Sequence, residues 1–262
     1  MKKMIEKIKP DKKLGQNFLI NNFTINTLNE IINVNEEDLI LEIGPGQGAL
    51  TESIIKRTNF YIGVEKDNNL CKFLKKKFDN NIKIINEDIL KTDLKNVYEK
   101  KYKIIGNIPY NISTKLLLKC IKNRNNILNI HFMMQKEFVD RITANCNNKI
   151  YGRLTVLIQI FFTCEKFIDI DPSDFYPQPK VHSSFLKLTP KSKILLKTNE
   201  IDEFFSFTRC IFNQRRKKIR NCLDSKCIDL YNNINKRAEE LTIPEIIELF
   251  RELRNDGKLI QN

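Results

Sequence analysis

The sequence lacks the features of a membrane-spanning, disulfide-linked or zinc-binding protein. No stretch approaches the roughly 18 consecutive apolar residues of a membrane-spanning helix, and residues 1–6 contain no apolar region typical of a secretion signal. The seven cysteines are scattered and never spaced as C-x-x-C, so neither a disulfide framework nor a zinc site is indicated. We therefore expect a soluble cytoplasmic protein with no bound metal and no membrane partner.

Acidic residues are too few to balance the basic ones. The 262 residues include 45 Lys and Arg against 32 Asp and Glu, which gives a net charge of +13. Such a surface attracts polyanions, most commonly nucleic acid or an anionic membrane. The frequent use of Lys, Asn and Ile is also compatible with compositional drift. Whether the charge serves to bind a polyanion therefore depends on whether the basic residues cluster.

Internal repeats and low-complexity linkers are absent, and short apolar runs alternate with amphipathic stretches. The runs span residues 39–43, 60–64, 82–85, 102–105, 128–134, 161–170 and 181–188. This alternation predicts an α/β fold with a doubly wound, mostly parallel, seven-stranded sheet that ends in an antiparallel pair. Helical periodicity replaces the strand signals after Pro190. We place a catalytic domain at residues 1–188 and a small all-α domain at 189–262.

A glycine-rich turn follows the first predicted strand. Gly44, Gly46 and Gly48 are spaced as G-x-G-x-G, and glycines there let the backbone approach a ligand at the carboxyl end of the sheet. The spacing is not the dinucleotide pattern G-x-G-x-x-G, and no G-K-[ST] follows. The turn therefore disfavours a nicotinamide dinucleotide or a nucleoside triphosphate as the ligand.

Acidic residues follow the next two predicted strands. Glu65 lies 21 residues after Gly44, at the position where a carboxylate usually binds a ribose diol. Asp88 could accept a hydrogen bond from an adenine amine while Ile89 covers the ring. Each acid alone is equally typical of a helix cap or a solvated surface. Together with the glycine turn, they predict an adenosyl site without phosphate-binding groups.

The fourth predicted strand ends in Asn107, Ile108, Pro109 and Tyr110. The Asn107 amide oxygen and the Ile108 carbonyl, which the proline turn exposes, could both accept hydrogen bonds from one amine. Tyr110 offers a face on which a base could stack. Two such bonds would direct the lone pair of an adenine amine outward, so methyl transfer from a sulfonium would rest on orientation and electrostatics. The alternative is a plain strand-to-helix turn.

Longer motifs occur along nearly the whole chain: LGQNFL (14–19), EIGPG (42–46), NIPYNIST (107–114), MQKE (134–137), YGRL (151–154), PQPKV (177–181) and FNQRRK (212–217). Together they resemble the rRNA adenine dimethyltransferases, a family of S-adenosylmethionine-dependent enzymes. The resemblance implies a Rossmann-like class I methyltransferase domain. It also implies that the N-terminal segment acts partly as a lid over the site.

The resemblance implies a cofactor site beside a base site. Asn17 and Leu19 would bind the methionine end of S-adenosylmethionine, which leaves as S-adenosylhomocysteine. Tyr110 would stack on a flipped adenine, and Phe175 would support its other face, although the neighbouring Tyr176 is an alternative. The implied cofactor-binding residues are Asn17, Leu19, Gly44, Gly46, Glu65, Lys66, Asp88, Ile89 and Asn107, and the implied catalytic residues are Asn107, Ile108, Pro109, Tyr110 and Phe175.

The resemblance also implies the substrate. It would be two adjacent adenosines, each dimethylated at N6, in the hairpin loop near the 3′ end of 16S rRNA, where opening the structure costs less than in a duplex. We expect a monomer that acts on an immature 30S particle, with a role in small-subunit biogenesis.

Basic residues cluster at two places. One cluster comprises Lys2, Lys3, Lys7, Lys9, Lys12 and Lys13, and the other comprises Arg209, Arg215, Arg216, Lys217, Lys218 and Arg220. The second cluster lies in a stretch free of acids, and we expect it to contact RNA phosphates. A solvated face is the alternative for each run, and it is the preferred interpretation for the lysines of 72–77.

Three other functions remain open from the sequence. They are methylation of large-subunit rRNA, a non-catalytic role as an assembly or transcription factor, and methylation of amines in DNA or small molecules. The motifs LGQNFL, YGRL and FNQRRK favour the small-subunit enzyme. Loss of Glu65, Asp88 or Asn107 would favour the non-catalytic role, but all three are present. The basic helical region disfavours the third.

Overall fold

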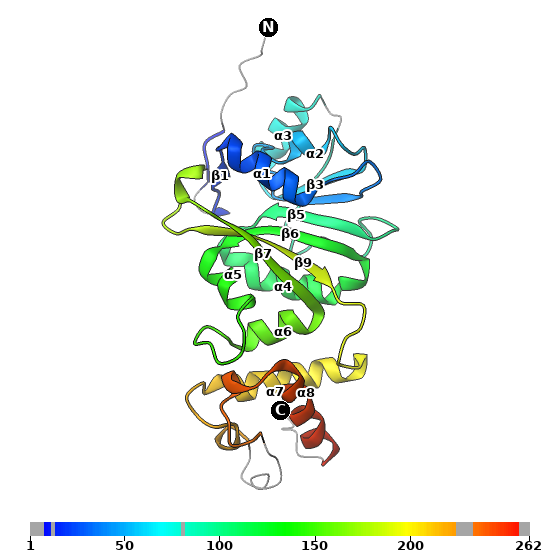
Figure 1. Cartoon of the computed structure of the whole chain (residues 1–262). Coiled ribbons are helices and arrows are strands. Elements are labelled where there is room, and N and C mark those ends of the chain that lie inside the picture. The colour runs from blue at the N-terminus through cyan, green and yellow to red at the C-terminus, as the bar shows by residue number, and fades with distance from the viewer. Residues whose placement is uncertain (1–7, 12–13, 80–81, 224–232, 257–262) are drawn as a thin grey trace. The chain divides into compact units, whose positions relative to one another are not determined.

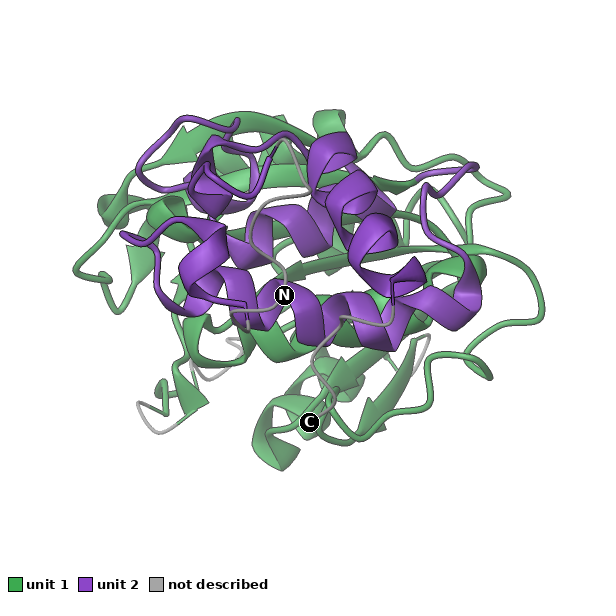
Figure 2. Ribbon diagram, turned by 90° about the horizontal axis from the view of Figure 1, so that it is seen from below, with its two compact units in different colours: residues 1–139, 164–190 green, residues 140–163, 191–262 purple. Residues whose placement is uncertain are grey.

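The chain forms two compact units (Figure 2). The computed structural model describes residues 8–11, 14–79, 82–223 and 233–256. The first unit comprises residues 1–139 and 164–190, and the second comprises residues 140–163 and 191–262. The functional boundary that we placed after residue 188 stays a prediction.

A seven-stranded sheet forms the centre of the first unit, in the order β4-β3-β2-β5-β6-β9-β7 (Figure 1). Its strands are β2 (Ile40–Ile43), β3 (Tyr61–Glu65), β4 (Lys83–Asn86), β5 (Tyr102–Asn107), β6 (Ile127–Gln135), β7 (Phe162–Ile170) and β9 (Ser183–Pro190). The pairs from β4 through β6 are parallel, and β6 and β9 are antiparallel. The predicted α/β fold with a mostly parallel seven-stranded sheet is therefore confirmed.

The helices of this unit are α1 (Asn22–Ile32), α2 (Thr51–Ile54), α3 (Asn68–Lys77) and α4 (Ser113–Lys122), and α5 (Lys136–Ile142) begins where β6 ends. Helices α2, α3 and α4 lie in the crossovers from β2 to β3, β3 to β4 and β5 to β6, whereas turns alone connect β4 to β5. The chain moves outward from β2 through β3 to β4 and then returns to the other side of β2 with β5. The strand order therefore reverses between β2 and β5, which is where open α/β sheets bind their ligands.

A buried ion pair accounts for the one Lys in β5. Lys103 Nζ lies 2.6 Å from Asp38 Oδ2 and donates to the Asn33 carbonyl at 3.1 Å. Its side chain is 8% exposed and that of Asp38 is 13% exposed. A charged group can occupy a buried strand when a partner compensates for its lost hydration.

Two short strands were not predicted from the sequence. Strands β1 (Phe18–Leu19) and β8 (Phe175–Tyr176) pair antiparallel, with Phe18 opposite Tyr176 and Leu19 opposite Phe175. The pair joins the N-terminal segment to the loop between β7 and β9. Two-residue strands carry no readable alternation, so only the fold reveals them.

The second unit is helical. It contains α6 (Arg153–Phe161), α7 (Ile201–Asn213) and α8 (Ile243–Asn255), and the last two lie where helical periodicity predicted helices. Phe250 of α8 packs edge-on against Phe204 of α7, with ring centroids 5.2 Å apart. Thr242 caps α8 in a reciprocal arrangement with Glu245, because the Thr242 backbone N–H donates to Glu245 Oε2 at 2.8 Å.

Within the described ranges, none of the helices has the length and apolar character needed to cross a lipid bilayer. The same residues contain no cluster of three or more His, Cys, Asp or Glu side chains suited to a metal ion. The cytoplasmic location and the metal-free site stay predictions.

Candidate functional site

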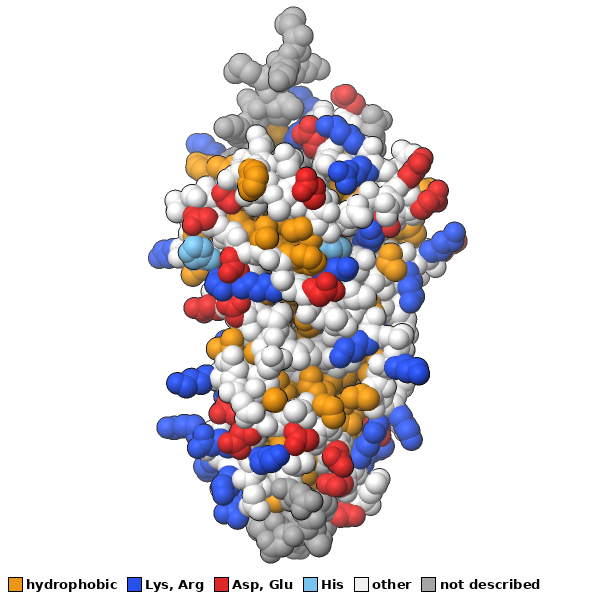
Figure 3. Space-filling view, in the orientation of Figure 1, with side chains coloured by type: hydrophobic (Ala, Val, Ile, Leu, Met, Phe, Trp, Pro, Cys, Tyr) orange, Lys and Arg blue, Asp and Glu red, His pale blue; other side chains and the backbone are white. Residues whose placement is uncertain are grey.

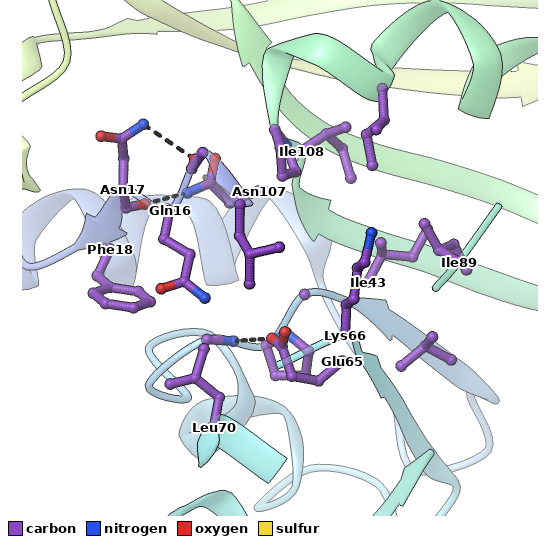
Figure 4. A pocket seen from close by; sticks show the side chains of 18 of the residues that line it. Gln16, Asn17, Phe18, Ile43, Glu65, Lys66, Leu70, Ile89, Asn107 and Ile108 are labelled. Atoms are coloured by element: carbon purple, nitrogen blue, oxygen red, sulfur yellow. Dashed lines mark hydrogen bonds between the residues drawn. The ribbon is translucent and has the colours of Figure 1, made fainter. Parts of the chain in front are cut away.

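A pocket lies at the carboxyl ends of β2, β3, β4 and β5 (Figure 4). It is lined by residues 14–19, 43–47, 49, 64–66, 70, 87–89, 107–112 and 175. These segments come from neighbouring strand ends and from the β1–β8 pair, so the pocket occupies the point where the strand order reverses. Every residue that the sequence analysis named as cofactor-binding or catalytic lines this pocket.

The glycine turn after β2 requires glycine for two reasons. Gly46 has a φ of 59°, in the left-handed region that favours glycine. A Cβ at this position would lie 3.1 Å from the Phe18 ring of β1. The turn and the N-terminal segment therefore approach each other as closely as their backbones and this ring permit.

Glu65 ends β3 with its carboxylate held by backbone groups. Oε2 accepts a hydrogen bond from the Gly46 N–H at 3.2 Å, and Oε1 accepts one from the Asp67 N–H at 2.9 Å. The residue is 6% exposed, and burial raises the pKa of Glu65 above its ordinary value. Each oxygen keeps lone pairs that can accept further hydrogen bonds from a ligand.

Asp88 lies after β4 in an anionic state. Oδ1 accepts from the Leu90 N–H at 2.9 Å, and Oδ2 lies 3.0 Å from Lys66 Nζ. The Leu90 hydrogen bond, with Lys66 adding to it, lowers the pKa of Asp88. Beside it, Ile89 is 5% exposed and provides an apolar surface. A polar acceptor and an apolar face thus lie side by side.

Asn107 ends β5, and a hydrogen bond fixes which way its amide faces. Its Nδ2 donates to the Asn17 carbonyl at 2.8 Å, as the dashed line in Figure 4 shows. Among the described residues no donor contacts Oδ1 of Asn107, which therefore remains an acceptor for a ligand. Ile108 continues the pocket wall, and its N–H donates to the Met133 carbonyl of β6 at 2.9 Å.

Tyr110 and Phe175, the aromatic residues named from the sequence, line the same pocket. The Tyr110 hydroxyl hydrogen-bonds to Ser183 Oγ of β9 at 3.0 Å. Phe175 of β8 is 4% exposed and lines the pocket, whereas Tyr176 is 60% exposed and does not. Of the two aromatic candidates in this loop, Phe175 is the one in position to contact a ligand in the pocket.

Gln16 and Phe18 of the LGQNFL motif also line the pocket, although neither was predicted as a site residue. Gln16 donates through Nε2 to Asp67 Oδ2 at 3.0 Å and accepts from the Asp11 N–H at 2.7 Å, so it connects the N-terminal segment to the residue that caps α3. Phe18 contributes its ring. The LGQNFL motif indicated that this segment belongs to the site. It did not distinguish the residues that face a ligand from those that hold the segment in place.

Neither histidine lines the pocket. His131 is 2% exposed in β6 and stacks on Phe185, with centroids 6.0 Å apart. Burial is the main reason that its pKa falls to about 3, so it is neutral at ordinary pH. A mechanism at this pocket therefore cannot draw on a histidine base.

The basic cluster of the second unit divides into two kinds of residue. Arg215 is engaged within the unit, because its Nη2 donates to the carbonyls of Lys149 at 2.6 Å and Tyr151 at 2.9 Å and lies 3.0 Å from Glu239 Oε2. Arg215 is nevertheless exposed, as are Arg209, Arg216, Lys217 and Lys218, and Arg220 is half-buried. Figure 3 shows Lys and Arg side chains projecting from the visible face of this unit.

Of the N-terminal basic cluster, Lys9 is exposed. Lys2, Lys3, Lys7, Lys12 and Lys13 lie outside the described residues.

The chain matches a known family over nearly its whole length. The model of the family "Ribosomal RNA adenine dimethylase" matches residues 7–254. The chain is 41% identical over 251 residues to "Ribosomal RNA small subunit methyltransferase A" of Wigglesworthia glossinidia brevipalpis, covering 92% of this chain and 96% of that protein. It is also 41% identical over 256 residues to the protein of the same name from Francisella tularensis subsp. novicida, covering 93% and 97%.

Solved structures share the fold. A dimethyladenosine transferase from Plasmodium falciparum has a TM-score of 0.80 and 26% identity, covering 92% of this chain and 98% of that one. The 23S rRNA methyltransferase ErmE has a TM-score of 0.67 and 24% identity, covering 91% and 100%. The family resemblance inferred from the motifs is confirmed. The chain belongs to the ribosomal RNA adenine dimethylase family and is an S-adenosylmethionine-dependent methyltransferase.

Proposed function

We propose that this protein dimethylates the N6 amines of two adjacent adenosines in the 3′-end hairpin loop of small-subunit (16S) rRNA. It acts as a cytoplasmic monomer on an immature 30S particle and contributes to small-subunit biogenesis. The observation that carries the proposal is the orientation of Asn107, which lines the pocket, whose amide nitrogen donates to the Asn17 carbonyl and whose oxygen accepts no hydrogen bond from the described residues. The names of the relatives support the choice of the small subunit.

The pocket residues fit an adenosyl sulfonium better than a nucleotide. The single Lys or Arg among the described lining residues is Lys66, and it pairs with Asp88. Glu65 and Asp88 instead supply negative charge, which attracts a cationic ligand that carries no phosphate. Ile43 and Ile89 provide apolar contacts for a purine ring. In this arrangement Glu65 accepts from the ribose hydroxyls, and Asp88 accepts from the adenine amine.

Catalysis in this site rests on orientation. S-adenosylmethionine supplies an activated methyl group when it is bound. In the first transfer, Asn107 Oδ1 and the Ile108 carbonyl accept hydrogen bonds from the two N–H groups of the target N6 amine, which turns the nitrogen lone pair out of the ring plane; in the second, the one remaining N–H donates to one of these acceptors. The amine passes its proton to water once the new bond has formed. These steps need no strong base, so they can take place in a pocket that no histidine lines.

The aromatic residues hold the base. Stacking on an aromatic side chain is a usual way to bind an unstacked nucleobase. The hydrogen bond to Ser183 restrains the Tyr110 ring, and Phe175 provides a second apolar surface. The exposed Arg209, Arg216, Lys217 and Lys218 of the second unit and the half-buried Arg220 contact RNA phosphates, while Arg215 stabilises the unit itself.

Product identity tests the proposal. Purified protein is incubated with isotope-labelled S-adenosylmethionine and with undermethylated small subunits, naked 16S rRNA or large subunits, and the digested nucleosides are analysed by mass spectrometry. We expect labelled N6,N6-dimethyladenosine in small-subunit RNA, at two per molecule. Label confined to large-subunit RNA, or no methylated base in any substrate, would contradict the proposal.

A further inference from the structure

Asp174 connects the N-terminal segment to the strand that carries Phe175. Its Oδ1 accepts a hydrogen bond from Asn21 Nδ2 at 2.6 Å, and its Oδ2 accepts one from Thr24 Oγ1 at 2.7 Å. Its carbonyl accepts from the Ile20 N–H at 2.8 Å. Both carboxylate oxygens and the carbonyl thus serve one connection between segments about 150 residues apart in sequence.

On its other side, the same N-terminal segment contacts the cofactor half of the pocket. The Asn17 carbonyl accepts from Asn107 Nδ2, and the Phe18 ring lies against the glycine turn at Gly46. Strand β1 therefore lies between the residues proposed to bind the cofactor and the strand that carries Phe175, which we propose contacts the target base.

The strand pair is too short to hold this arrangement by its backbone alone. Only two residue pairs, Phe18 with Tyr176 and Leu19 with Phe175, are in register between β1 and β8. Even complete isolated two-stranded hairpins are marginally stable. Hydrogen bonds to a carboxylate are roughly twice as strong as neutral ones, so the two side-chain bonds of Asp174 are a main support of the pair.

We propose that Asp174 is a positioning residue that couples cofactor binding to the ordering of Phe175. A cofactor that contacts the glycine turn and β1 favours the position of β1 seen here, and the bonds of Asp174 pass that preference to β8. The enzyme then presents the base-contacting ring chiefly when a methyl donor is in place. The inference rests on the proposed function, because it assumes which half of the pocket takes the cofactor.

Hydrogen–deuterium exchange of the full-length protein, with S-adenosylhomocysteine as the probe, tests the coupling without any methyl transfer. In the wild type we expect saturating probe to slow amide exchange at least about fivefold, both in the glycine turn (residues 44–49) and at residues 174–176, which comprise Asp174 and β8. In Asp174→Ala, the slowing at 44–49 should remain, and the slowing at 174–176 should fall below about twofold.

Two variants separate this role from a general weakening of the loop. Asp174→Asn should restore the slowing, because its Oδ1 still accepts from Asn21 and its Nδ2 can donate to Thr24 Oγ1. Asp171→Ala is the matched control, since among the described residues the Asp171 carboxylate accepts hydrogen bonds only from Ser173, at 2.9 Å from the backbone N–H and 2.7 Å from Oγ. In Asp171→Ala the probe should slow amide exchange at residues 174–176 as much as it does in the wild type. If Asp174→Ala fails to fold, Thr24→Val removes one of the two bonds and should roughly halve the slowing.

The outcomes distinguish the two claims. Slowing at 44–49 without slowing at 174–176 in the wild type would overturn the coupling and leave the proposed function intact. Undiminished slowing at 174–176 in Asp174→Ala would do the same. No slowing in either segment would overturn both, because the probe would then not bind in this pocket.

Discussion

At the scale of single residues, Asn107 combines two tasks in one amide. Its nitrogen anchors it to the Asn17 carbonyl, and its oxygen is the acceptor that we assign to the target amine. Asn107→Ala should therefore lower the single-turnover transfer rate about 10²–10³-fold, the usual effect of removing one oriented polar group from an active site. The affinity for S-adenosylhomocysteine, measured by calorimetry, should change by no more than a few-fold.

An exposed asparagine outside the pocket, Asn69 of α3, provides the matched control. Asn69→Ala should transfer methyl groups at the wild-type rate. Wild-type activity in Asn107→Ala would remove the amide from the mechanism.

Glu65 allows a second test at this scale. Its buried carboxylate accepts from two backbone N–H groups and, in the proposed complex, from a ribose. Glu65→Gln replaces one acceptor oxygen with a donor NH₂ group, which would then face either a backbone N–H or a ribose hydroxyl. We expect the dissociation constant for S-adenosylhomocysteine to rise about tenfold or more, measured by calorimetry. Glu52→Gln, on the exposed face of α2, is the control, and equal affinity in the two variants would exclude the ribose contact.

At the scale of elements, a buried carboxyl ties three of them together beneath the glycine turn. Oε2 of Glu42 in β2 accepts from Thr51 Oγ1 of α2 at 2.6 Å and from the Tyr61 hydroxyl of β3 at 2.7 Å. Burial, which outweighs these two bonds, raises the pKa of Glu42 from 4.5 to about 7. Glu65 adds to the increase, and Lys77 opposes it.

This pKa predicts a pH dependence of stability. Between pH 4.5 and about 7 the folded chain keeps a proton on Glu42 that the unfolded chain has released, so the free energy of unfolding falls as the pH rises through this range. The loss amounts to about 3 kcal/mol, at about 1.4 kcal/mol per pH unit. Glu42→Gln carries no such proton. Its free energy of unfolding relative to wild type should therefore improve by about that amount from pH 4.5 to 7.5, in urea titrations at each pH. Parallel pH profiles would refute the assignment.

Elements with a clear period could be predicted from the sequence, and those without one could not. The strands at 40–43, 61–65 and 102–107 were visible as apolar runs, and parallel strands place their carboxyl ends at one edge. The grouping of Glu65, Asp88 and Asn107 therefore followed from topology alone. The bonds of Arg215 to Lys149, Tyr151 and Glu239 and the β1–β8 pair depend on partners distant in sequence, which no local pattern specifies.

At the scale of the whole molecule, RNA binding depends on where the basic residues lie as well as on the net charge of +13. Arg216, Lys217 and Lys218 are exposed after α7. Arg216→Ala/Lys217→Ala/Lys218→Ala should weaken RNA binding and reduce the slope of log affinity against log salt by about 2–3, because each lost phosphate contact contributes roughly 0.7–0.9. Affinity for S-adenosylhomocysteine should not change.

A triple variant of α3 controls for net charge. Lys72→Ala/Lys75→Ala/Lys76→Ala removes the same charge from exposed positions that we interpret as a solvated face. Filter binding across a salt series should separate the two variants. Equal slopes would mean that RNA responds to total charge and not to this cluster.

The central claim is geometric, and a structure of the protein with S-adenosylhomocysteine and an adenosine-containing RNA loop tests it most directly. The account predicts the adenine N6 within about 2.7–3.2 Å of both Asn107 Oδ1 and the Ile108 carbonyl oxygen, with the cofactor sulfur on the opposite side of that nitrogen. A bound adenine whose N6 faces away from Asn107, or a cofactor outside the wall formed by Glu65 and Asp88, would contradict it.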